Sequence, residues 1–303
     1  MENRFIETPI ISIDNVTCSK CGLCSRVCPI KVFDFKKGEV PSIHNNDECV
    51  LCGQCLCVCS TNSINHSGFK LSNFKRIQNR QPFPPEIAFD FLSQRRSVRN
   101  YKKEVPSKEL LEKILLIAGF APGSPHHRVG WVRNVTVVTG AENIKIVLDM
   151  TAEYMQKTIK LLNGWMIKLA AKFDDSAKAG IAVVPSFKIA LDELKNGRDS
   201  IMYNAPVAIF LHAPMYSSLP QIDCDAACMM IQLNAAANGL GTCWNGLIQG
   251  AASGDHLRGF TKLADFLKIP KGNKCYAAMT AGFPSVVLHS LPERRTDISW
   301  IIG

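Results

Sequence analysis

The sequence has no apolar run long enough to cross a bilayer. Its longest apolar stretches, 205–211 and 276–281, are far shorter than the roughly 20 residues that a transmembrane helix needs. Residues 1–5 also lack the apolar core of a secretory signal peptide. We therefore expect a soluble, cytoplasmic protein without a membrane partner.

Dense runs of Lys and Arg are missing too, and so is any alternation of basic and aromatic residues, although the formal net charge is +9. Nearly all of the positive surplus lies beyond residue 60, scattered among helical patterns. This distribution is typical of a solvated surface, or of one that attracts anionic cofactors and substrates. It argues against a nucleic-acid partner, and a nucleic-acid-binding protein remains a rival hypothesis on charge alone.

The chain is long enough for two unequal domains. With 303 residues, of which 47% are apolar, it can bury one large core and a small additional module. Residues 1–66 form a cysteine-rich module, and residues 67–86 form a polar, basic linker that ends in a proline-rich stretch. Residues 87–303 carry the helix and strand patterns of a larger domain.

The apolar periodicity of this larger domain predicts mostly helices around a few buried strands. Ser107 is a suitable N-cap for the expected helix 107–119, and Gly239 ends the expected helix 223–238. The apolar residues Leu161, Leu162, Trp165, Met166 and Leu169 in the third helix are interpreted as a packed face. The expected helices are 87–94, 107–119, 144–173 and 223–238, and the expected strands are 135–139, 206–211 and 276–282.

Nine of the thirteen cysteines lie between residues 18 and 59, which favours metal binding in a reducing cytosol over disulphides. They form two copies of one motif: Cys18-x-x-Cys21-x-x-Cys24-x-x-x-Cys28 and Cys49-x-x-Cys52-x-x-Cys55-x-x-x-Cys59. Zinc would need only four ligands per site and does not explain three closely spaced cysteines in each half. The doubled motif instead predicts two 4Fe-4S clusters.

In each motif three thiolates in a tight loop hold one cluster, and the fourth reaches across to the other cluster. One cluster is therefore expected on Cys18, Cys21, Cys24 and Cys59, and the other on Cys49, Cys52, Cys55 and Cys28. Residues 10–66 resemble the bacterial two-cluster ferredoxins. The resemblance implies a module that moves electrons one at a time.

Gly22 and Gly53, which follow the second cysteine of each motif, would let the backbone approach the clusters. The module departs from its own repeat at Ser60, where the first motif has Pro29. It also contains Cys57, which has no ligand role in the pattern and is interpreted as a small apolar residue packed beside a cluster.

A second group of motifs begins with Arg95-Arg96-Ser97-Val98-Arg99, where guanidiniums and a hydroxyl can converge on a phosphate or an anionic ring. Later come Ala121-Pro122-Gly123-Ser124, Ala205-Pro206, Asp225 to Cys228, Asn238 to Gly246 and Arg294-Arg295. In this order and spacing the motifs resemble the FMN-dependent nitroreductase family across residues 87–303. No Rossmann glycine loop is visible.

This second resemblance implies an FMN site. Five residues from two distant segments would contact the phosphate, the ribityl chain and the pyrimidine edge: Arg95, Arg96, Ser97, Arg99 and Arg294. In the turn 239–246 the Gly246 amide would face the flavin N5, Asn245 would also contact the cofactor, and Cys243 would pack near the ring. Ordinary core packing is the alternative for Cys243 and for Trp244.

One loop departs from the common family pattern. Where an asparagine and a glutamine usually follow Ala121-Pro122, this chain has Pro125-His126-His127-Arg128. His126 most nearly occupies the asparagine position. Either histidine would bond the flavin or donate a proton to substrate, and a solvated loop is the alternative for each.

The resemblance further implies an α+β fold in which helices flank a mostly antiparallel sheet. It implies a homodimer with the flavin at the subunit interface and with a C-terminal arm, 283–303, that crosses onto the partner. Such an arrangement would take some cofactor ligands from the partner chain.

Together the two modules look like a fusion of a ferredoxin with a nitroreductase. The clusters would accept single electrons from reduced ferredoxin or NAD(P)H and pass two to FMN, which would reduce a nitroaromatic or a quinone. Two alternatives stay open. One is a related FMN reductase that acts on enones, and the other is a redox carrier or sensor that delivers electrons to a partner protein.

Overall fold

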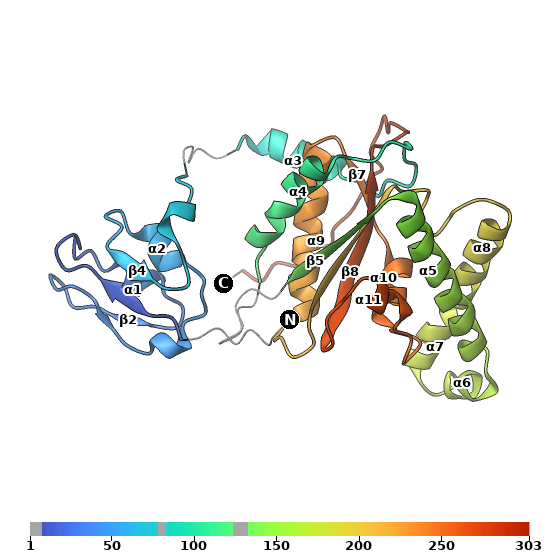
Figure 1. Ribbon diagram of the computed structural model, residues 1–303, viewed down its shortest axis with the longest axis horizontal. Coiled ribbons are helices and arrows are strands. Elements are labelled where there is room, and N and C mark those ends of the chain that lie inside the picture. Colours follow the sequence, from blue (N-terminus) through green and yellow to red (C-terminus); the bar gives the residue numbers. More distant parts are fainter. Residues whose placement is uncertain (1–7, 78–82, 124–132, 303) are drawn as a thin grey trace.

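The computed structural model describes residues 8–77, 83–123 and 133–302. Figure 1 shows a small cysteine-rich module and a larger domain built around one sheet. None of the helices in these described ranges combines the length and apolarity that a bilayer crossing demands.

The cysteine-rich module consists of two copies of one short unit. In each copy a glycine with a φ of 70° begins a short helix: Gly22 precedes α1 (Leu23–Val27), and Gly53 precedes α2 (Gln54–Val58). Lys20 and Leu51 share a φ of 56° at matching positions. Because non-glycine residues seldom adopt positive φ, the shared values show that the two copies have the same backbone path.

Short strands close this module. Strand β1 (Ile11–Ile13) pairs antiparallel with β4 (Ile64–His66), and β2 (Phe33–Asp34) pairs with β3 (Ser42–Ile43). Single 3-10 turns occur at Asn46–Glu48 and Leu71–Asn73. The core is small, with Val32, Phe33 and Ile64 almost fully buried.

The larger domain contains a four-stranded sheet in the order β5-β6-β8-β7, and every neighbouring pair is antiparallel. The strands are β5 (Asn134–Thr139), β6 (Val207–Pro214), β7 (Gly241–Trp244) and β8 (Asn273–Gly282). This arrangement confirms the expected α+β fold with an antiparallel sheet.

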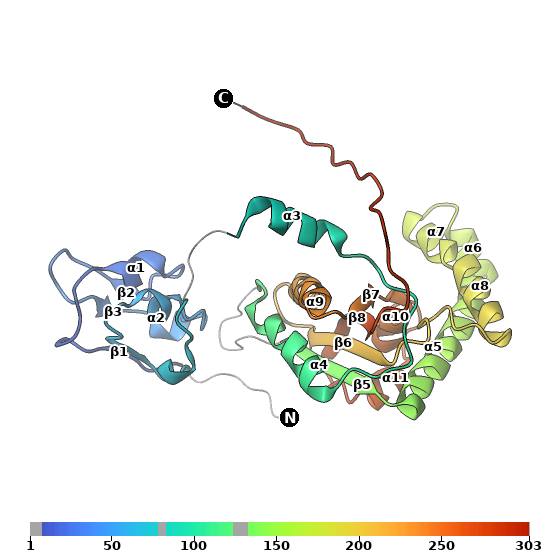
Figure 2. The same cartoon turned by 90° about the horizontal axis from the view of Figure 1, so that it is seen from above.

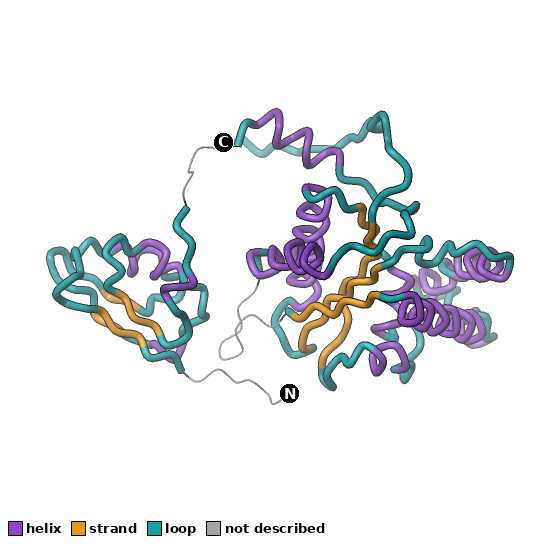
Figure 3. Tube along the Cα trace, turned by 45° about the horizontal axis from the view of Figure 1, so that its top comes forward, coloured by secondary structure: helices purple, strands orange, loops and turns teal. Residues whose placement is uncertain are grey.

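Helices cover both faces of this sheet, as Figure 3 shows. The helices are α3 (Pro85–Gln94), α4 (Lys108–Leu115), α5 (Ala141–Leu162), α6 (Trp165–Ala170), α7 (Asp175–Ala182), α8 (Val184–Lys195), α9 (Pro220–Ala237), α10 (Gly246–Ser253) and α11 (Lys262–Phe266), with a 3-10 turn at Leu116–Phe120. On β6, Ala208 and Phe210 pack with α5, α8, α10 and α11, whereas Val207, Ile209 and Leu211 pack with α4 and α9. Burial on both faces explains why this strand is continuously apolar.

Helix ends follow local chemistry. The Ser107 hydroxyl accepts a hydrogen bond from the Leu110 amide at 3.2 Å, which confirms the expected N-cap. After α9, Gly239 has a φ of 75°, its amide donates to the carbonyl of Ala236, and the Leu240 amide donates to Ala235. This pair of bonds is a Schellman motif and ends the helix where the sequence predicted.

Two expectations about the segment 144–173 are wrong. The segment forms two helices, α5 and α6. Asn163 and Gly164 separate them, and Gly164 has an extended backbone conformation. The proposed packed face is also mostly exposed in this chain: Leu162 is 7% exposed, whereas Trp165 is 74% exposed and Met166 65%. Helix α3 begins at Pro85, slightly before the expected start of the helix 87–94.

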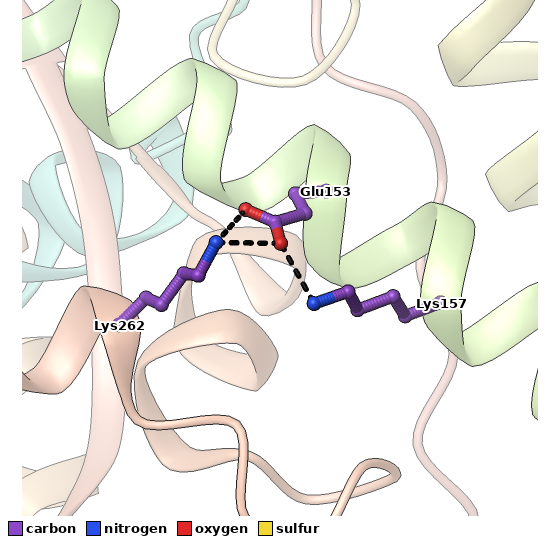
Figure 4. A network of polar contacts seen from close by, with 3 residues as sticks. All are labelled: Glu153, Lys157 and Lys262. Carbon is purple, nitrogen blue, oxygen red and sulfur yellow. Dashed lines mark hydrogen bonds and ion pairs between the residues drawn. The ribbon is translucent and has the colours of Figure 1, made fainter.

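Charged residues connect α11 to α5 on the surface (Figure 4). The Lys262 ammonium lies 2.7 Å from both carboxylate oxygens of Glu153, and the Lys157 ammonium lies 2.7 Å from one of them. Hydrogen bonds from Lys157 and Lys262 hold the pKa of Glu153 below its usual value. Because these charged side chains are partly exposed to solvent, their ion pairs contribute much less to stability than the burial of the apolar core does.

The C-terminal segment 283–302 leaves the domain as an extended chain, and Figure 2 shows it running away from the sheet. Its large apolar side chains are exposed, including Val287 at 73%, Trp300 at 75% and Ile302 at 84%.

The burial of Phe210 leads to a prediction about the stability of the larger domain. Phe210 is fully buried in β6, so Phe210→Ala should lower the free energy of unfolding by about 3–5 kcal/mol through lost burial and a cavity. Phe173, which is 87% exposed, is the matched control, and Phe173→Ala should change this free energy by less than about 0.5 kcal/mol. Urea unfolding followed by circular dichroism measures both, and equal losses would contradict the described core.

Candidate functional site

The cysteine-rich module contains two cavities, each lined by four cysteines of the doubled motif. One is lined by Cys18, Cys21, Cys24 and Cys59. The other is lined by Cys28, Cys49, Cys52 and Cys55, together with His66. The fourth cysteine of each motif thus lies with the first three of the other motif.

Local backbone geometry produces this exchange. Cys28 and Cys59 follow the last residues of α1 and α2 with extended ψ values of 113° and 101°, so the chain turns away from each helix. Their sulphurs accept hydrogen bonds from the amides of Val32 at 3.3 Å and Ser63 at 3.2 Å. At Gly22, an added Cβ would lie 2.4 Å from the Phe35 ring, so this turn excludes larger residues.

If all of the clustered thiols were ionised, their negative charges would repel one another. Burial raises the pKa of the Cys55 thiol to about 12, with smaller contributions from the neighbouring Cys52, Cys49 and Cys28. Burial also raises the pKa of Cys24, with smaller contributions from Cys21 and Cys18. Four thiolates around one cavity therefore need a cationic centre to compensate them.

No group of three or more His, Cys, Asp and Glu side chains in the described ranges has the arrangement that holds a single metal ion. In a cubane cluster each thiolate binds its own iron, so the sulphurs do not converge on one atom. Cys57 does not pack beside either cavity, because its side chain is exposed, and the interpretation as a buried small residue is wrong. Cys224, Cys228 and Cys275 are buried.

The larger domain contains a cavity of about 730 Å³, within the size range of small-molecule sites. Four segments line it: the chain after α3, the C-terminal part of α9, the turn that leads into β7, and the start of the C-terminal segment. Arg95 and Arg96 contribute positive charge, and no Asp or Glu belongs to its described lining. The cavity therefore suits an anion.

A glycine lets the arginine segment lie against the sheet. Ser97 forms a parallel bridge to Thr242 of β7, and the Val98 amide donates to the Thr242 carbonyl at 2.9 Å. A Cβ at Gly241 would lie 2.7 Å from the Val98 side chain. Only glycine permits this approach, so the segment 95–99 depends on Gly241 for its position.

Arg95 is anchored by a residue that the sequence analysis missed. Its guanidinium donates to the side-chain oxygen of Gln232 at 3.3 Å, and Gln232, on α9, is only 2% exposed. A guanidinium has five N–H donors, so this contact leaves most of them for a ligand. A polar residue within an apolar helix was the available signal.

Arg99 faces a different part of the domain. It lies 5.8 Å from the centroid of the Tyr203 ring, and its attraction to Cys243 is the largest cause of its raised pKa. Tyr203 has a φ of 61° in a turn whose amides are bound by the Asp199 carboxylate, which accepts from Met202 at 2.7 Å. Cys243 is 2% exposed, consistent with core packing.

Asn245 has a structural role within the chain. Its side-chain oxygen accepts from the amides of Leu247 and Ile248 at the start of α10, and its side-chain nitrogen donates to the Ile201 carbonyl at 2.7 Å. Gly246, in contrast, is exposed, and a Cβ added there would meet nothing within 4 Å. As the first helical residue, its amide has no acceptor within α10.

Among the predicted residues that the structure describes, six do not line this cavity: Ser97, Arg99, Cys243, Asn245, Gly246 and Arg294. Arg294 lies on the extended C-terminal segment and is exposed. His126 and His127 fall outside the described residues. The ends of their loop are joined by Arg133, whose guanidinium donates to the carbonyls of Ala121 at 2.9 Å and Pro122 at 2.8 Å.

Comparison with known proteins agrees with this geometry. A nitroreductase from Desulfitobacterium hafniense, solved with bound FMN, has 22% sequence identity and a TM-score of 0.51, over 70% of this chain and 97% of that chain. An FMN-dependent nitroreductase from Clostridium difficile has 18% identity and a TM-score of 0.51, over 70% and 98%. At these identities the likeness shows a shared fold. A search of curated proteins found no match.

A model of the nitroreductase family matches residues 92–283, which span β5 to β8 and the segment 95–99. The matched region covers well over half of the chain and contains the whole sheet and the part of the cavity lining that precedes residue 284. The chain therefore belongs to the nitroreductase family.

Proposed function

We propose that this protein is an iron-sulphur flavoprotein oxidoreductase. In this proposal electrons from reduced ferredoxin or NAD(P)H enter two 4Fe-4S clusters, pass to FMN and reduce a small electrophilic acceptor, a nitroaromatic or a quinone. The observation that carries the proposal is the pair of four-cysteine cavities in a chain whose larger domain belongs to the nitroreductase family.

The donor sets fit two clusters. Each cavity is lined by four thiols and no carboxylate, as 4Fe-4S clusters require. Backbone amides already point at sulphurs, including those of Val32 and Ser63, and such bonds stabilise the negative charge on ligand sulphurs. The proposed ligand sets are Cys18, Cys21, Cys24 and Cys59 for one cluster and Cys49, Cys52, Cys55 and Cys28 for the other.

The cavity of the larger domain fits FMN. Arg95 and Arg96 would hold the phosphate, because guanidiniums bind phosphate oxygens with paired, charge-assisted hydrogen bonds. The exposed Gly246 amide would donate to the flavin ring, and the open space beside it leaves room for that approach. When bound, FMN accepts electrons singly and passes them on in pairs. Arg99, Ser97, Arg294 and His126 remain proposed contacts.

A homodimer would cover the exposed apolar residues of the C-terminal segment. Trp300, Ile301 and Ile302 have almost no contact with their own chain, since each is at least 75% exposed. Large side chains of this kind favour a protein interface. We propose that the segment 283–302 crosses onto the partner subunit, where Arg294 would reach the partner's cofactor.

The cofactor content of the protein tests this proposal directly. Anaerobically purified protein should contain about eight irons, eight sulphides and one FMN per chain. Stepwise reduction should then bleach the clusters and the flavin in the same molecule, as followed by visible absorption and paramagnetic resonance. Iron without flavin would favour a carrier or sensor, and absence of turnover with any nitro compound, quinone or enone would do the same.

The second prediction concerns the arginines. Arg95→Ala should weaken FMN binding about tenfold or more, because a charge-assisted hydrogen bond contributes about 1.5–3 kcal/mol. Quenching of FMN fluorescence during titration of the apoprotein measures the affinity. Arg258→Ala, which removes an exposed arginine of the same domain, is the control and should leave it unchanged. Equal affinities for both variants would contradict the assignment.

The third prediction tests arm exchange with a matched pair. Trp300 and Trp165 are similarly exposed in this chain, at 75% and 74%. If the C-terminal segment docks on a partner, Trp300→Ala should raise the dimer dissociation constant about tenfold or more, since interface tryptophans often contribute 2 kcal/mol or more. Trp165→Ala should not change it. Sedimentation equilibrium measures both, and a monomeric wild type would contradict the dimer.

A further inference from the structure

One cysteine of the second cavity has a side-chain donor beside it. The Nε2 atom of His66 lies 3.5 Å from the Cys49 sulphur, and His66 lines the cavity of Cys28, Cys49, Cys52 and Cys55. On the other side of the ring, Nδ1 accepts the Gly68 amide proton at 3.0 Å. An N–H cannot donate to a nitrogen that itself carries a proton, so the proton of the neutral ring is on Nε2. His66 therefore donates to Cys49.

The ring is held firmly in this position. His66 ends β4, pairs with Ile11 of β1 and is 6% exposed. The Phe69 ring packs edge-on against it at a centroid distance of 5.0 Å. An added Cβ at Gly68 would lie 3.1 Å from the His66 ring, so glycine leaves the space that the imidazole needs. The donor is thus preorganised toward the sulphur.

The first copy of the unit has no histidine at this position. Gly22 and Gly53 occupy matching positions in the two copies, and at the same offset the counterpart of His66 is Phe35. A phenylalanine cannot donate a hydrogen bond. The first cavity has other donors, because the Lys20 amide reaches the Cys18 sulphur at 3.4 Å and the Ser19 side chain hydrogen-bonds to Cys21. His66 is therefore one of several donors in which the two cavities differ.

The other cavity has a hydroxyl of its own near a sulphur. Thr61 Oγ1 lies 3.6 Å from the Cys59 sulphur and 2.6 Å from the Ser63 hydroxyl. The Thr17 hydroxyl donates to the Ser63 hydroxyl and to the Asp14 carboxylate, both at 2.9 Å. In this direction Ser63 can donate to Thr61, and Thr61 to the Cys59 sulphur, so both cavities have side-chain donors.

We propose that His66 raises the reduction potential of the cluster on Cys28, Cys49, Cys52 and Cys55. This inference rests on the proposed function. Reduction adds negative charge that spreads onto the ligand sulphurs, and a hydrogen bond from Nε2 to Cys49 stabilises the reduced form more than the oxidised form. His66 acts only through Cys49 and touches no substrate.

The histidine has a consequence for electron transfer. The cluster beside His66 accepts an electron more readily than it would without this hydrogen bond. A difference of tenfold in the one-electron reduction equilibrium corresponds to 59 mV.

The test is a potentiometric titration of the full-length holoprotein under anaerobic conditions, followed by paramagnetic resonance. His66→Phe, which copies Phe35 of the first unit, should lower one of the two cluster potentials by about tenfold in the reduction equilibrium, or about 59 mV, and leave the other in place. His44→Phe, which changes an exposed histidine of the same module, should alter neither.

A second measurement needs no variant, in case His66→Phe loses a cluster. Wild type labelled with 15N-histidine should show hyperfine coupling from a histidine nitrogen to one reduced cluster, and the proton on that nitrogen should exchange in D2O. Two clusters without this coupling, or with potentials unaffected by His66→Phe at full iron content, would overturn the inference alone. Wild type without two cluster signals would overturn the proposed function and the inference together.

Discussion

The larger domain depends on the antiparallel pair of β6 and β8 in the middle of its sheet. Residues Val207 to Ala213 and Ala277 to Ala281 are almost completely buried, with helices packed on both faces. Such strands leave no polar face for solvent, so their backbone groups must be paired by flanking strands. Strand β7 pairs with β8 at the edge of the sheet. The start of β7 lines the cavity, and Gly246 follows shortly after its end.

The cavity follows from one close approach along β7. Because Gly241 has no Cβ, Val98 lies directly against the strand, and the arginines on either side are held at a defined depth. Arg95 points to Gln232 on α9, while Arg99 lies over Tyr203. The segment 95–99 thus connects the cavity lined by Arg95 and Arg96 to the turn at residues 199–204.

The cysteine-rich module shows how a duplicated unit can become asymmetric. Matching backbone angles at Gly22 and Gly53 preserve the shape of the two cavities. The differences lie in side chains around them: His66 beside Cys49, and the Thr61 hydroxyl beside Cys59. Substitution outside the cysteines therefore changes the electrostatic surroundings of a site while the thiol geometry stays the same.

Local patterns were sufficient for much of this protein. The spacing of the cysteines, the N-cap Ser107, the stop at Gly239 and the buried strand 206–211 depend on residues close in sequence, so the chain alone determined them. The grouping of Cys59 with Cys18, Cys21 and Cys24 was also predicted, because a repeated motif carries information about its partner. Tertiary structure alone decided the contacts of Gln232, Tyr203 and Asn245, and the exposure of Trp165 and Met166. The physical reason is that these depend on which distant segments lie against each residue, and side-chain periodicity does not encode that.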